Sequence, residues 1–262
     1  MTSVIYKPGG PAGEYAEWAC NLFEGCRHGC RYCYAPIFLR RTLSARAGRS
    51  LTIAEARRAF HENYGPRANI LHRLELSLRR FGARGAKIFL CFTCDPCQSR
   101  ADVEQITAPA IELIHASGNY VQLCSKNPLF APFDLLGAGD ELWTTLTLLD
   151  DDQACWEPNI ENNAVSFRLV ALDRAHRAGI RTAVSFEPVI DPDQTLELIA
   201  LAAPYLDRAF IGRFNHLSSC DWPSDDWRAR IESIDWPQFR AEAVALCEWL
   251  GLEYTIKEDS RG

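Results

Sequence analysis

Short apolar runs alternate with amphipathic segments along most of the chain. Six runs have the length and the β-branched and aromatic content of buried strands, and they lie at 19–23, 87–92, 120–124, 142–149, 181–186 and 208–211. Segments that repeat apolar residues at helical spacing lie at 103–117, 166–178 and 193–203. Gly118 and Gly179 follow two of these segments, as residues that end helices commonly do. The alternation predicts an α/β fold, in which helices cover a parallel sheet.

Two stretches depart from this alternation. Residues 52–81 form a longer helical segment with a break at Gly65, and we expect a helical insertion after the first strand. Residues 212–236 mix Pro, Ser and Asp with tryptophans, which predicts a Trp-containing loop near the C-terminus. Long loops in compact domains are often functional, and the alternative is a surface flap. A helix at 238–250 and a short strand at 253–257 complete the prediction. The tryptophans of the loop are Trp222, Trp227 and Trp236.

The composition is that of a globular protein with a core. Hydrophobic residues make up 47% of the 262 residues and charged residues 24%. No run of about 18 apolar residues is present, so we expect no membrane span, and residues 1–13 lack the pattern of a signal peptide. We therefore expect a cytoplasmic protein. In a reducing compartment its eleven cysteines are more simply explained as metal ligands or reactive thiols than as disulfides.

Charge is distributed unevenly along the chain. The net charge is −6, yet residues 25–90 contain fourteen Lys and Arg against three acidic residues, so this segment carries +11 and the other residues −17. A basic segment of this kind predicts a face that meets a polyanion such as DNA. The alternative is a solvated helical surface whose charge is balanced by acidic loops in the fold.

Cys26, Cys30 and Cys33 stand in a CxxxCxxC pattern. Thiolates select iron–sulfur clusters, zinc or copper(I). Three closely spaced thiolates hold three corners of a four-iron cluster and leave the fourth iron open, and an open position is where a metal site performs chemistry. A zinc site would require a fourth ligand, and the spacing of His28 does not match the usual zinc patterns. The pattern therefore favours a [4Fe–4S] cluster.

The sequence around these cysteines resembles the signature of the radical S-adenosylmethionine (SAM) superfamily. Residues 21–36 read Asn-Leu-Phe-Glu-Gly-Cys-Arg-His-Gly-Cys-Arg-Tyr-Cys-Tyr-Ala-Pro, which is similar to the branch around spore photoproduct lyase. Upstream, Tyr6-Lys-Pro-Gly-Gly and Gly13-Glu-Tyr-Ala also resemble small members of that branch. A weaker similarity extends from about residue 6 to residue 214.

The resemblance implies a partial (β/α)6 TIM-type barrel of the radical SAM type, which agrees with the six predicted strands. It implies one domain over residues 1–262, with an N-terminal extension at 1–16, a barrel core at 17–212, and a C-terminal loop, helix and short strand at 213–262. In such barrels the chemistry takes place at the carboxyl ends of the strands, and the cysteine loop follows the first predicted strand.

The resemblance also implies a mechanism with two cofactors, a [4Fe–4S] cluster and S-adenosyl-L-methionine. The open iron would bind the amino and carboxylate groups of SAM. One electron, from a donor such as flavodoxin or ferredoxin, would cleave the sulfonium to give methionine and a 5′-deoxyadenosyl radical that removes a hydrogen atom from the substrate. The chain itself would position the cofactor, exclude water and control the radical.

Several residues match positions that hold SAM in this family. Tyr32 stands where an aromatic residue packs near the adenine, and Lys126 matches a lysine that pairs with the methionine carboxylate. The segment that ends at Asp95 takes the place of the family's Thr-Ser-Asp, with Cys94 instead of the serine. The implied cofactor-binding residues are Tyr32, Tyr34, Cys94, Asp95, Lys126, Thr145, Thr147 and Glu157.

The last members of this set lie on and after the fourth predicted strand. Thr145 and Thr147 alternate along the strand, so both hydroxyls point to one face, where they suit a ribose or an amine. Glu157 and Arg168 resemble the family's Glu-Pro segment and the arginine that follows it. Either residue could contact the cofactor, but Arg168 is more simply interpreted as part of a structural ion pair.

A second set of cysteines, Cys91, Cys94 and Cys97, recurs at every third residue at the end of the second predicted strand. In spore photoproduct lyase a cysteine of this strand returns a hydrogen atom to the product radical, but Phe92 takes that position here. The catalytic candidates are therefore Cys94, Cys91 and Tyr34, with Cys94 as the preferred functional thiol. The alternatives are packing as small apolar residues or an auxiliary cluster, for which the candidate fourth ligands are Cys124 and Cys220.

A barrel does not define a substrate. The resemblance and the basic segment at 25–90 favour a thymine-derived base in DNA, which would have to be flipped out of a duplex to reach a radical. The Trp-containing loop would offer surfaces for stacking. We expect modification, isomerisation or repair of such a base. The alternatives are a radical SAM enzyme that acts on RNA, a peptide or a small metabolite, and a zinc- or cluster-stabilised binding module without enzymatic activity.

Overall fold

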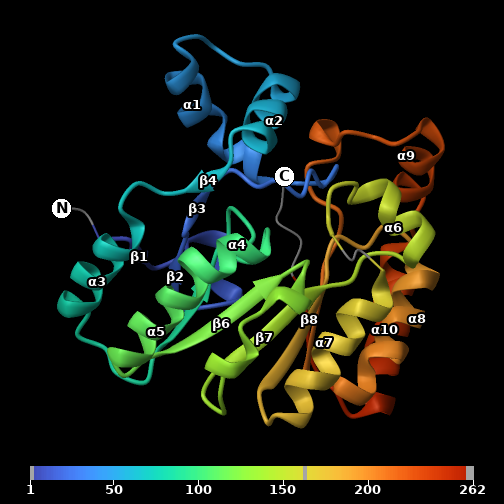
Figure 1. Cartoon of the computed structure of the whole chain (residues 1–262). Helices are drawn as coiled ribbons and strands as arrows, with labels where there is room; N and C mark the ends of the chain where they lie inside the picture. The colour runs from blue at the N-terminus through green and yellow to red at the C-terminus, as the bar shows by residue number, and fades with distance from the viewer. Residues whose placement is uncertain (1–2, 162–163, 258–262) are drawn as a thin grey trace.

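The computed structural model describes residues 3–161 and 164–257, and its centre is an open, mostly parallel sheet (Figure 1). The strand order in the described residues is β1-β2-β5-β6-β7-β8-β9-β10. β1 pairs antiparallel with β2, and the other neighbours are parallel. The predicted α/β fold with a parallel sheet is confirmed. The strands are β1 (Ile5–Tyr6), β2 (Trp18–Cys20), β5 (Lys87–Leu90), β6 (Tyr120–Ser125), β7 (Glu141–Thr145), β8 (Arg181–Phe186), β9 (Arg208–Ile211) and β10 (Glu253–Ile256).

The sheet differs from the six predicted strands in its extent. All six lie in it, but β1 and β10 extend its two edges. The strand predicted at 19–23 is divided, because β2 is followed by β3 (Phe23–Glu24), which pairs with β4 (Gly65–Pro66) in a separate small sheet. The strand predicted at 142–149 ends four residues early.

Helices cover the sheet and extend beyond its carboxyl edge (Figure 1). α5, α7, α8 and α10 lie along the strands, whereas α1, α2 and α9 lie above the carboxyl ends. No helix in the described part of the chain is long and apolar enough to cross a membrane. The helices are α1 (Ala35–Ala47), α2 (Ile53–Glu62), α3 (Ile70–Arg80), α4 (Arg100–Asp102), α5 (Ala108–Ala116), α6 (Asp150–Trp156), α7 (Val165–Arg177), α8 (Pro192–Ala202), α9 (Asp225–Glu232) and α10 (Trp236–Leu250).

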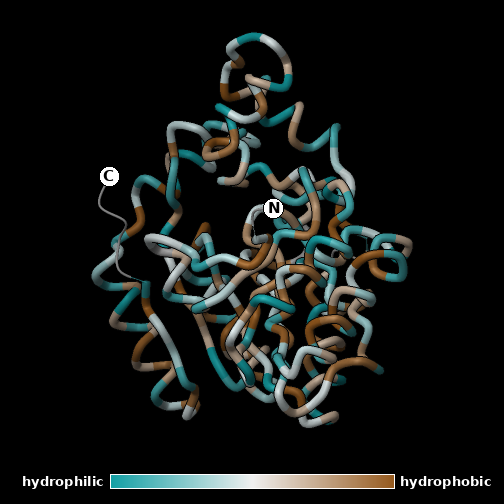
Figure 2. Tube along the Cα trace, turned by 90° about the vertical axis from the view of Figure 1, so that its left-hand side faces the viewer, coloured by the Kyte–Doolittle hydropathy of each residue, from teal (hydrophilic) through white to brown (hydrophobic). Residues whose placement is uncertain are grey.

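The outer face of the sheet packs against these helices through aliphatic residues. Ile88 and Leu90 of β5 belong to one core cluster with residues of α3 and α5, and Val184 and Phe186 of β8 belong to another with residues of α8 and α10. Hydrophobic and hydrophilic residues are interspersed along the helices (Figure 2), which is typical of helices that turn one apolar side to a core. Burial of this apolar surface is the main stabilising contribution.

The inner face carries a smaller, aromatic cluster, and the sheet curves around it. The Tyr15 ring lies 6.2 Å from that of Phe89 on β5 and 5.0 Å from that of Phe210 on β9, and Trp143 lies between them. β5 and β9 are four strand spacings apart, which is about 19 Å along a flat sheet. One tyrosine contacts both strands only because this face is concave.

The helical insertion after the first strand is larger than predicted, because α1 begins directly after the cysteine loop. Only Ala35 and Pro36 of α1 are buried, so its sequence lacks the apolar stripe by which an amphipathic helix is recognised. α2 begins with a capping box, in which the Thr52 hydroxyl accepts from the Glu55 N–H and the Glu55 carboxylate accepts from the Thr52 N–H. α1 and α2 pack against each other above the sheet (Figure 1).

The Trp-containing segment at 212–236 is not a simple loop, since it contains α9. Trp222 stacks on Phe214, with ring centroids 5.6 Å apart, and both Trp222 and Trp227 meet the edge of the fully buried Trp156. These two tryptophans therefore cover the core around Trp156, which favours the structural interpretation of the segment over a stacking platform. Trp236 begins α10 and is buried in another cluster.

Candidate functional site

The cysteine loop lies between β3 and α1, and α2 holds it in place. Gly25 has a φ of +69° and lies so close to α2 that a Cβ atom would stand 2.4 Å from the Phe60 carbonyl oxygen. The Cys26 N–H donates to that same carbonyl at 3.3 Å, and His61 Nδ1 donates to the Cys26 carbonyl at 2.7 Å. The loop conformation is therefore fixed by the chain itself.

The three thiols of the loop are free and lie in a buried environment. Cys26 and Cys30 are buried, and Cys33 is partly buried. Burial raises the pKa of all three, and the negative charge of Asp95 raises that of Cys26 further. Thiols bind metals as thiolates, so loading releases protons, and the cation offsets the cost of burying the negative charge.

The donors of this loop fit a cluster better than a single metal ion. Across 3–161 and 164–257, no three Cys, His, Asp or Glu side chains gather around one point where they would hold an ion. Structural zinc requires four ligands around one ion, whereas three thiolates of one loop suit three corners of a [4Fe–4S] cluster. The zinc alternative is the weaker of the two.

Behind the loop, the structure brings together a buried network of charges. Glu157 is fully buried and accepts hydrogen bonds from the Tyr32 hydroxyl, from Lys126 Nζ at 3.1 Å and from Arg168 Nη2 at 2.5 Å. Burial acts to raise the pKa of Glu157, but Arg168 and Lys126 outweigh burial and hold the pKa at about 2. Arg168 also donates to the Thr145 carbonyl at 2.5 Å. The predicted pair of Glu157 and Arg168 is thus a structural ion pair, and Lys126 joins it at the side of the cysteine loop.

Asp95 connects two strand ends with the cysteine loop. Its Oδ1 atom accepts from the Cys97 N–H and the Ser125 hydroxyl, each at 2.7 Å, and its Oδ2 atom accepts from the Lys126 N–H at 2.8 Å. The same Oδ2 lies 3.4 Å from Nδ1 of His28, which stands between the first two loop cysteines. Asp95 therefore fixes the backbone around Lys126 as well as facing the loop.

Buried polar atoms without a hydrogen-bond partner collect around this network. In the described residues they include both ring nitrogens of His28, Thr147 Oγ1, Asn127 Nδ2, Gln98 Nε2 and Trp156 Nε1. Buried polar groups of folded proteins are nearly always paired with protein or water, so a concentration of exceptions requires an explanation. Asn127 follows Lys126, and the Trp156 ring lies 6.1 Å from that of Tyr32. A polar ligand beside the cysteine loop would pair with such groups, so the residues present fit SAM.

The backbone conformation at the end of β5 directs Cys91, in the second set of cysteines, toward the outer face of the sheet. Cys91 has a φ of +75°, which ends β5 and breaks the alternation of side chains along it. Its thiol lies in the outer core, where Sγ accepts from the Leu22 N–H at 3.4 Å. Phe92 takes the inner face instead and stacks on Phe89 at 4.2 Å. This placement favours core packing for Cys91 over a catalytic role.

The other two cysteines of the set have different surroundings. Cys97 is fully buried in the outer core. Cys94 packs with Cys26 and Cys33 and shares a hydrogen bond with the thiol of Cys91. Cys91 and Cys97 are buried in the outer core while Cys94 lies beside the loop, and this separation of environments disfavours an auxiliary cluster. Cys94 alone lies next to the cysteine loop.

Tyr34 lies at the outer rim of the site. Its hydroxyl donates to the Phe92 carbonyl, while its ring forms an edge contact with Phe38 of α1, at 5.8 Å. Phe38 is 65% exposed and meets the ring of His216 at 5.4 Å. Tyr34 therefore connects the end of β5 with an exposed aromatic surface on α1.

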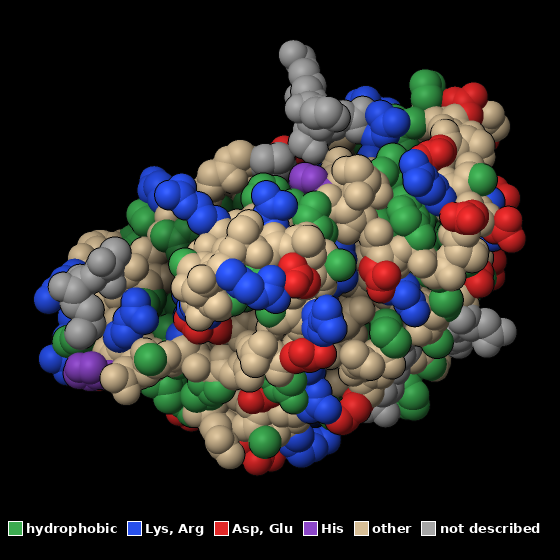
Figure 3. All heavy atoms as spheres, turned by 90° about the horizontal axis from the view of Figure 1, so that it is seen from above, with side chains coloured by type: hydrophobic (Ala, Val, Ile, Leu, Met, Phe, Trp, Pro, Cys, Tyr) green, Lys and Arg blue, Asp and Glu red, His purple; other side chains and the backbone are tan. Residues whose placement is uncertain are grey.

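Charge is distributed unevenly over the surface seen from the carboxyl edge (Figure 3). Lys and Arg predominate toward the side on which α3 lies in Figure 1, acidic residues are more frequent toward the opposite side, and the two signs are mixed in between. Part of the excess is balanced locally, since Arg46 pairs with Glu24 and Arg49 with Glu55, each at 2.8 Å. The segment is thus a basic surface in which some arginines are already paired.

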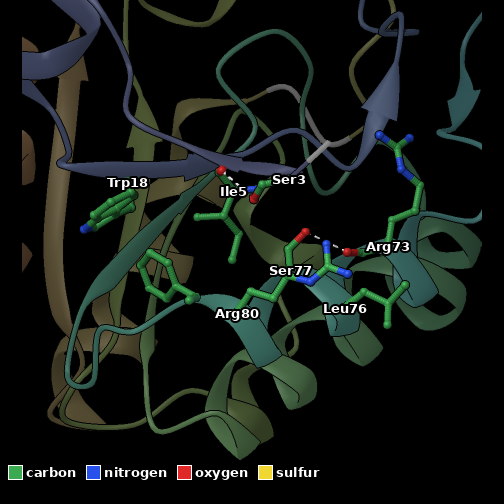
Figure 4. Close-up of a pocket in the computed structure, with 8 residues that line it drawn as sticks. Ser3, Ile5, Trp18, Arg73, Leu76, Ser77 and Arg80 are labelled. Atoms are coloured by element: carbon green, nitrogen blue, oxygen red, sulfur yellow. Dashed lines mark hydrogen bonds between the residues drawn. The ribbon is translucent and has the colours of Figure 1, made fainter. Parts of the chain in front are cut away.

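A cavity of about 190 Å³ lies away from the site, between α3 and the strands β1 and β2 (Figure 4). Its lining includes Trp18, Arg73 and Ser77 and no residue of the cysteine loop. The Ser77 hydroxyl donates to the Arg73 carbonyl at 2.8 Å and accepts from the Val4 N–H at 3.0 Å. This hydroxyl joins α3 to the N-terminal strand, so we interpret the cavity as part of the packing of that edge.

Comparison with solved structures shows the fold of spore photoproduct lyase. A tyrosine-to-phenylalanine variant of that enzyme is 13% identical to the chain, with a TM-score of 0.64 over 95% of this chain and 78% of its own. Spore photoproduct lyase complexed with dinucleoside spore photoproduct gives 13% identity and 0.60, over 96% and 80%. A double variant with bound AdoMet and dinucleoside spore photoproduct gives 13% and 0.58, over 92% and 76%.

The sequence comparisons give no match. No protein-family model matches the chain, and no curated protein matches it. The resemblance drawn from the cysteine loop is therefore confirmed at the level of the fold, by the solved structures.

Sequence reasoning missed several residues of the site. The spacing of His28 matches no usual zinc pattern, and no motif in the sequence points to Trp156 or Asn127. Trp156 precedes Glu157 and Asn127 follows Lys126, so adjacency to a predicted site residue was the available signal. The support of the loop by His61 of α2 had no signal in the sequence, because it depends on tertiary contact.

Proposed function

We propose that the protein is a radical SAM enzyme, with a [4Fe–4S] cluster on Cys26, Cys30 and Cys33 and SAM bound beside it. The observation that carries the proposal is the position of the three thiols next to the Lys126–Glu157 network, among buried polar atoms that have no partner. The fold supports it, since a solved structure with this fold contains bound AdoMet. When bound, the two cofactors supply one-electron cleavage of SAM and a radical that removes a hydrogen atom from the substrate.

The residues of this chain would bind the cofactor, exclude water and supply a hydrogen atom. Lys126 offers a cation for the carboxylate of SAM, and Glu157 together with Tyr32 holds Lys126 in position. The hydroxyl of Thr147 suits a polar group of the cofactor. The aromatic inner face excludes water below the site, which limits quenching of a radical. Cys94, beside the loop, is the thiol best placed to give a hydrogen atom.

We further propose that the substrate is a thymine-derived base in DNA, which the enzyme modifies, isomerises or repairs. Two observations support this: the predominantly basic side of the molecule suits a phosphate backbone (Figure 3), and spore photoproduct lyase, which shares the fold, is solved with a dinucleoside photoproduct. An electron carrier such as flavodoxin or ferredoxin would supply the electron. RNA, peptides and small metabolites are the competing substrates.

The test is the yield of 5′-deoxyadenosine from anaerobically reconstituted protein with SAM and dithionite, with and without DNA. The proposal predicts 5′-deoxyadenosine in both mixtures and a clear increase with DNA. Slow formation that does not respond to DNA would contradict the substrate and retain the enzyme class. No 5′-deoxyadenosine from protein with a full cluster would contradict the enzyme class.

A further inference from the structure

His28 is the most isolated buried polar side chain of the site. It is 1% exposed, and neither ring nitrogen has a hydrogen-bond partner in the described residues. It lies two residues from both Cys26 and Cys30, so it is part of the loop that holds the three thiols. A buried polar atom left unpaired costs about 1–3 kcal/mol, so a fold that keeps one in this position implies a partner that the protein chain does not supply.

The neighbours of His28 determine which nitrogen is available. Oδ2 of Asp95 lies 3.4 Å from Nδ1, and this oxygen already accepts from the Lys126 N–H. An acceptor oxygen facing Nδ1 favours the tautomer with the proton on Nδ1, because a bare nitrogen lone pair would be repelled. In that tautomer Nε2 has a free lone pair and serves only as an acceptor. Carboxylates orient histidine rings toward bound groups in this way at many metal sites.

We propose that His28 Nε2 accepts a hydrogen bond from SAM, through an N–H of the α-amino group or through a ribose hydroxyl. This inference rests on the proposed function, since it assigns a further contact to the same site. SAM carries hydrogen-bond donors for such an acceptor. Oδ2 of Asp95, which lies 3.4 Å from His28 Nδ1, also accepts from the backbone N–H of Lys126, the residue proposed to bind the SAM carboxylate. The competing assignment is direct ligation of an iron by Nε2.

The experiment is SAM binding to anaerobically reconstituted protein, measured by equilibrium dialysis. We expect His28→Phe to retain the iron content of the wild-type protein and to bind SAM about 5- to 100-fold more weakly, because it leaves a donor of SAM unpaired. His28→Gln, which restores an acceptor oxygen, is expected to recover part of the affinity. His72→Phe is the matched control, since His72 is exposed on α3, and it should bind like the wild type.

Spectroscopy separates the two assignments. Without SAM, the EPR spectrum of the reduced cluster is expected to be the same in the wild type and in His28→Phe. If His28→Phe does not take up the cluster, His28→Gln is used for this comparison. An imidazole nitrogen coupling that is present without SAM and lost in the variant would assign His28 to an iron and overturn the proposal. Equal SAM affinity in the wild type and both variants would also overturn it, while leaving the proposed function intact. A wild-type protein with a full cluster that does not bind SAM would overturn the proposed function itself.

Discussion

The chain contains two cysteine-rich segments with similar spacing and different surroundings. In the loop, α2 fixes the backbone of Cys26, and the thiols lie before a buried charge network. In the segment at the end of β5, Cys91 and Cys97 turn into the aliphatic outer core and only Cys94 reaches the loop. The difference teaches that similar cysteine spacing can place thiols in two environments: the loop presents them to polar groups, whereas the second segment packs most of them into the core.

The largest expected effect separates the two segments directly. Cys30→Ala removes one of the three proposed cluster ligands and should abolish most of the bound iron after reconstitution. Cys97→Ala, the matched variant in the other segment, should retain the iron and lose only modest stability, because it shortens a side chain in the core. Iron analysis and visible absorbance measure both. Comparable iron loss in the two variants would show that the second segment also holds a cofactor.

The charge network distinguishes the loop from the second segment, and removing its acid should be costly. Glu157→Gln leaves Lys126 and Arg168 buried without a full countercharge, and loss of one partner of a buried ion pair costs about 3–5 kcal/mol. Urea unfolding measures the change in the free energy of unfolding. Glu232→Gln, which breaks an exposed pair with Arg228 on α9, should leave stability nearly unchanged, because water screens exposed ion pairs. Similar values for both variants would contradict the assigned importance of the network.

Glu187, at the same edge of the sheet, lies away from Lys126 and Arg168, and its pKa shifts in the opposite direction to that of Glu157. Glu187 follows β8 and accepts from the Ser185 hydroxyl at 3.1 Å. Burial raises its pKa to about 7, with Glu14 adding to the effect and Lys257 opposing it. The folded protein then holds a proton that the unfolded chain, with a pKa near 4.3, has already lost. Stability therefore falls as pH rises from about 4.3 to about 7.

Glu187→Gln should remove this pH dependence. Relative to the wild type, the variant should gain about 1–2 kcal/mol of stability between pH 5 and pH 8, since one pKa unit corresponds to about 1.4 kcal/mol and partial exposure reduces the effect. Urea unfolding at the two pH values provides the measurement. The same stability difference at both pH values would show that Glu187 is ionised in the folded protein throughout.

The smallest effect concerns the backbone at Cys91. Its φ of +75° is favourable for glycine and strained for other residues. Cys91→Gly should therefore be about 1 kcal/mol more stable than Cys91→Ala, although glycine is ordinarily the less stable of the two in a strand. Chemical unfolding of the pair measures the difference, and both variants should bind iron normally. An alanine variant that is clearly the more stable would argue against strain at this position.

Much of the fold follows from the sequence because its strands are short and continuously apolar. The strands at 181–186 and 208–211 match β8 and β9 to the residue. The hydrophobic pattern does not predict α1, because too few residues of this helix are buried to produce an apolar repeat. It also does not predict α9, because tryptophans among polar residues in this segment are typical of a loop. Both elements lie above the sheet, where packing is sparse and periodicity carries less information.

The candidate site was predictable only in part. Cys26 is predicted from the spacing of three cysteines, and Lys126 and Glu157 from resemblance; the fold places all three at the same edge of the sheet. The orientation of Cys91 was not predictable, because a single left-handed residue reverses the alternation of a strand. The sequence also does not predict that His28 is unpaired, because this depends on the tertiary contacts around its ring.

The most direct test of the account is cluster analysis of the anaerobically reconstituted protein before and after addition of SAM. The account predicts a brown protein with about four iron and four sulfide per chain, and an EPR spectrum of the reduced cluster that changes when SAM occupies the open iron. A colourless protein that binds zinc, or a full cluster whose spectrum does not respond to SAM, would contradict the claim that the loop holds a cluster with one open iron.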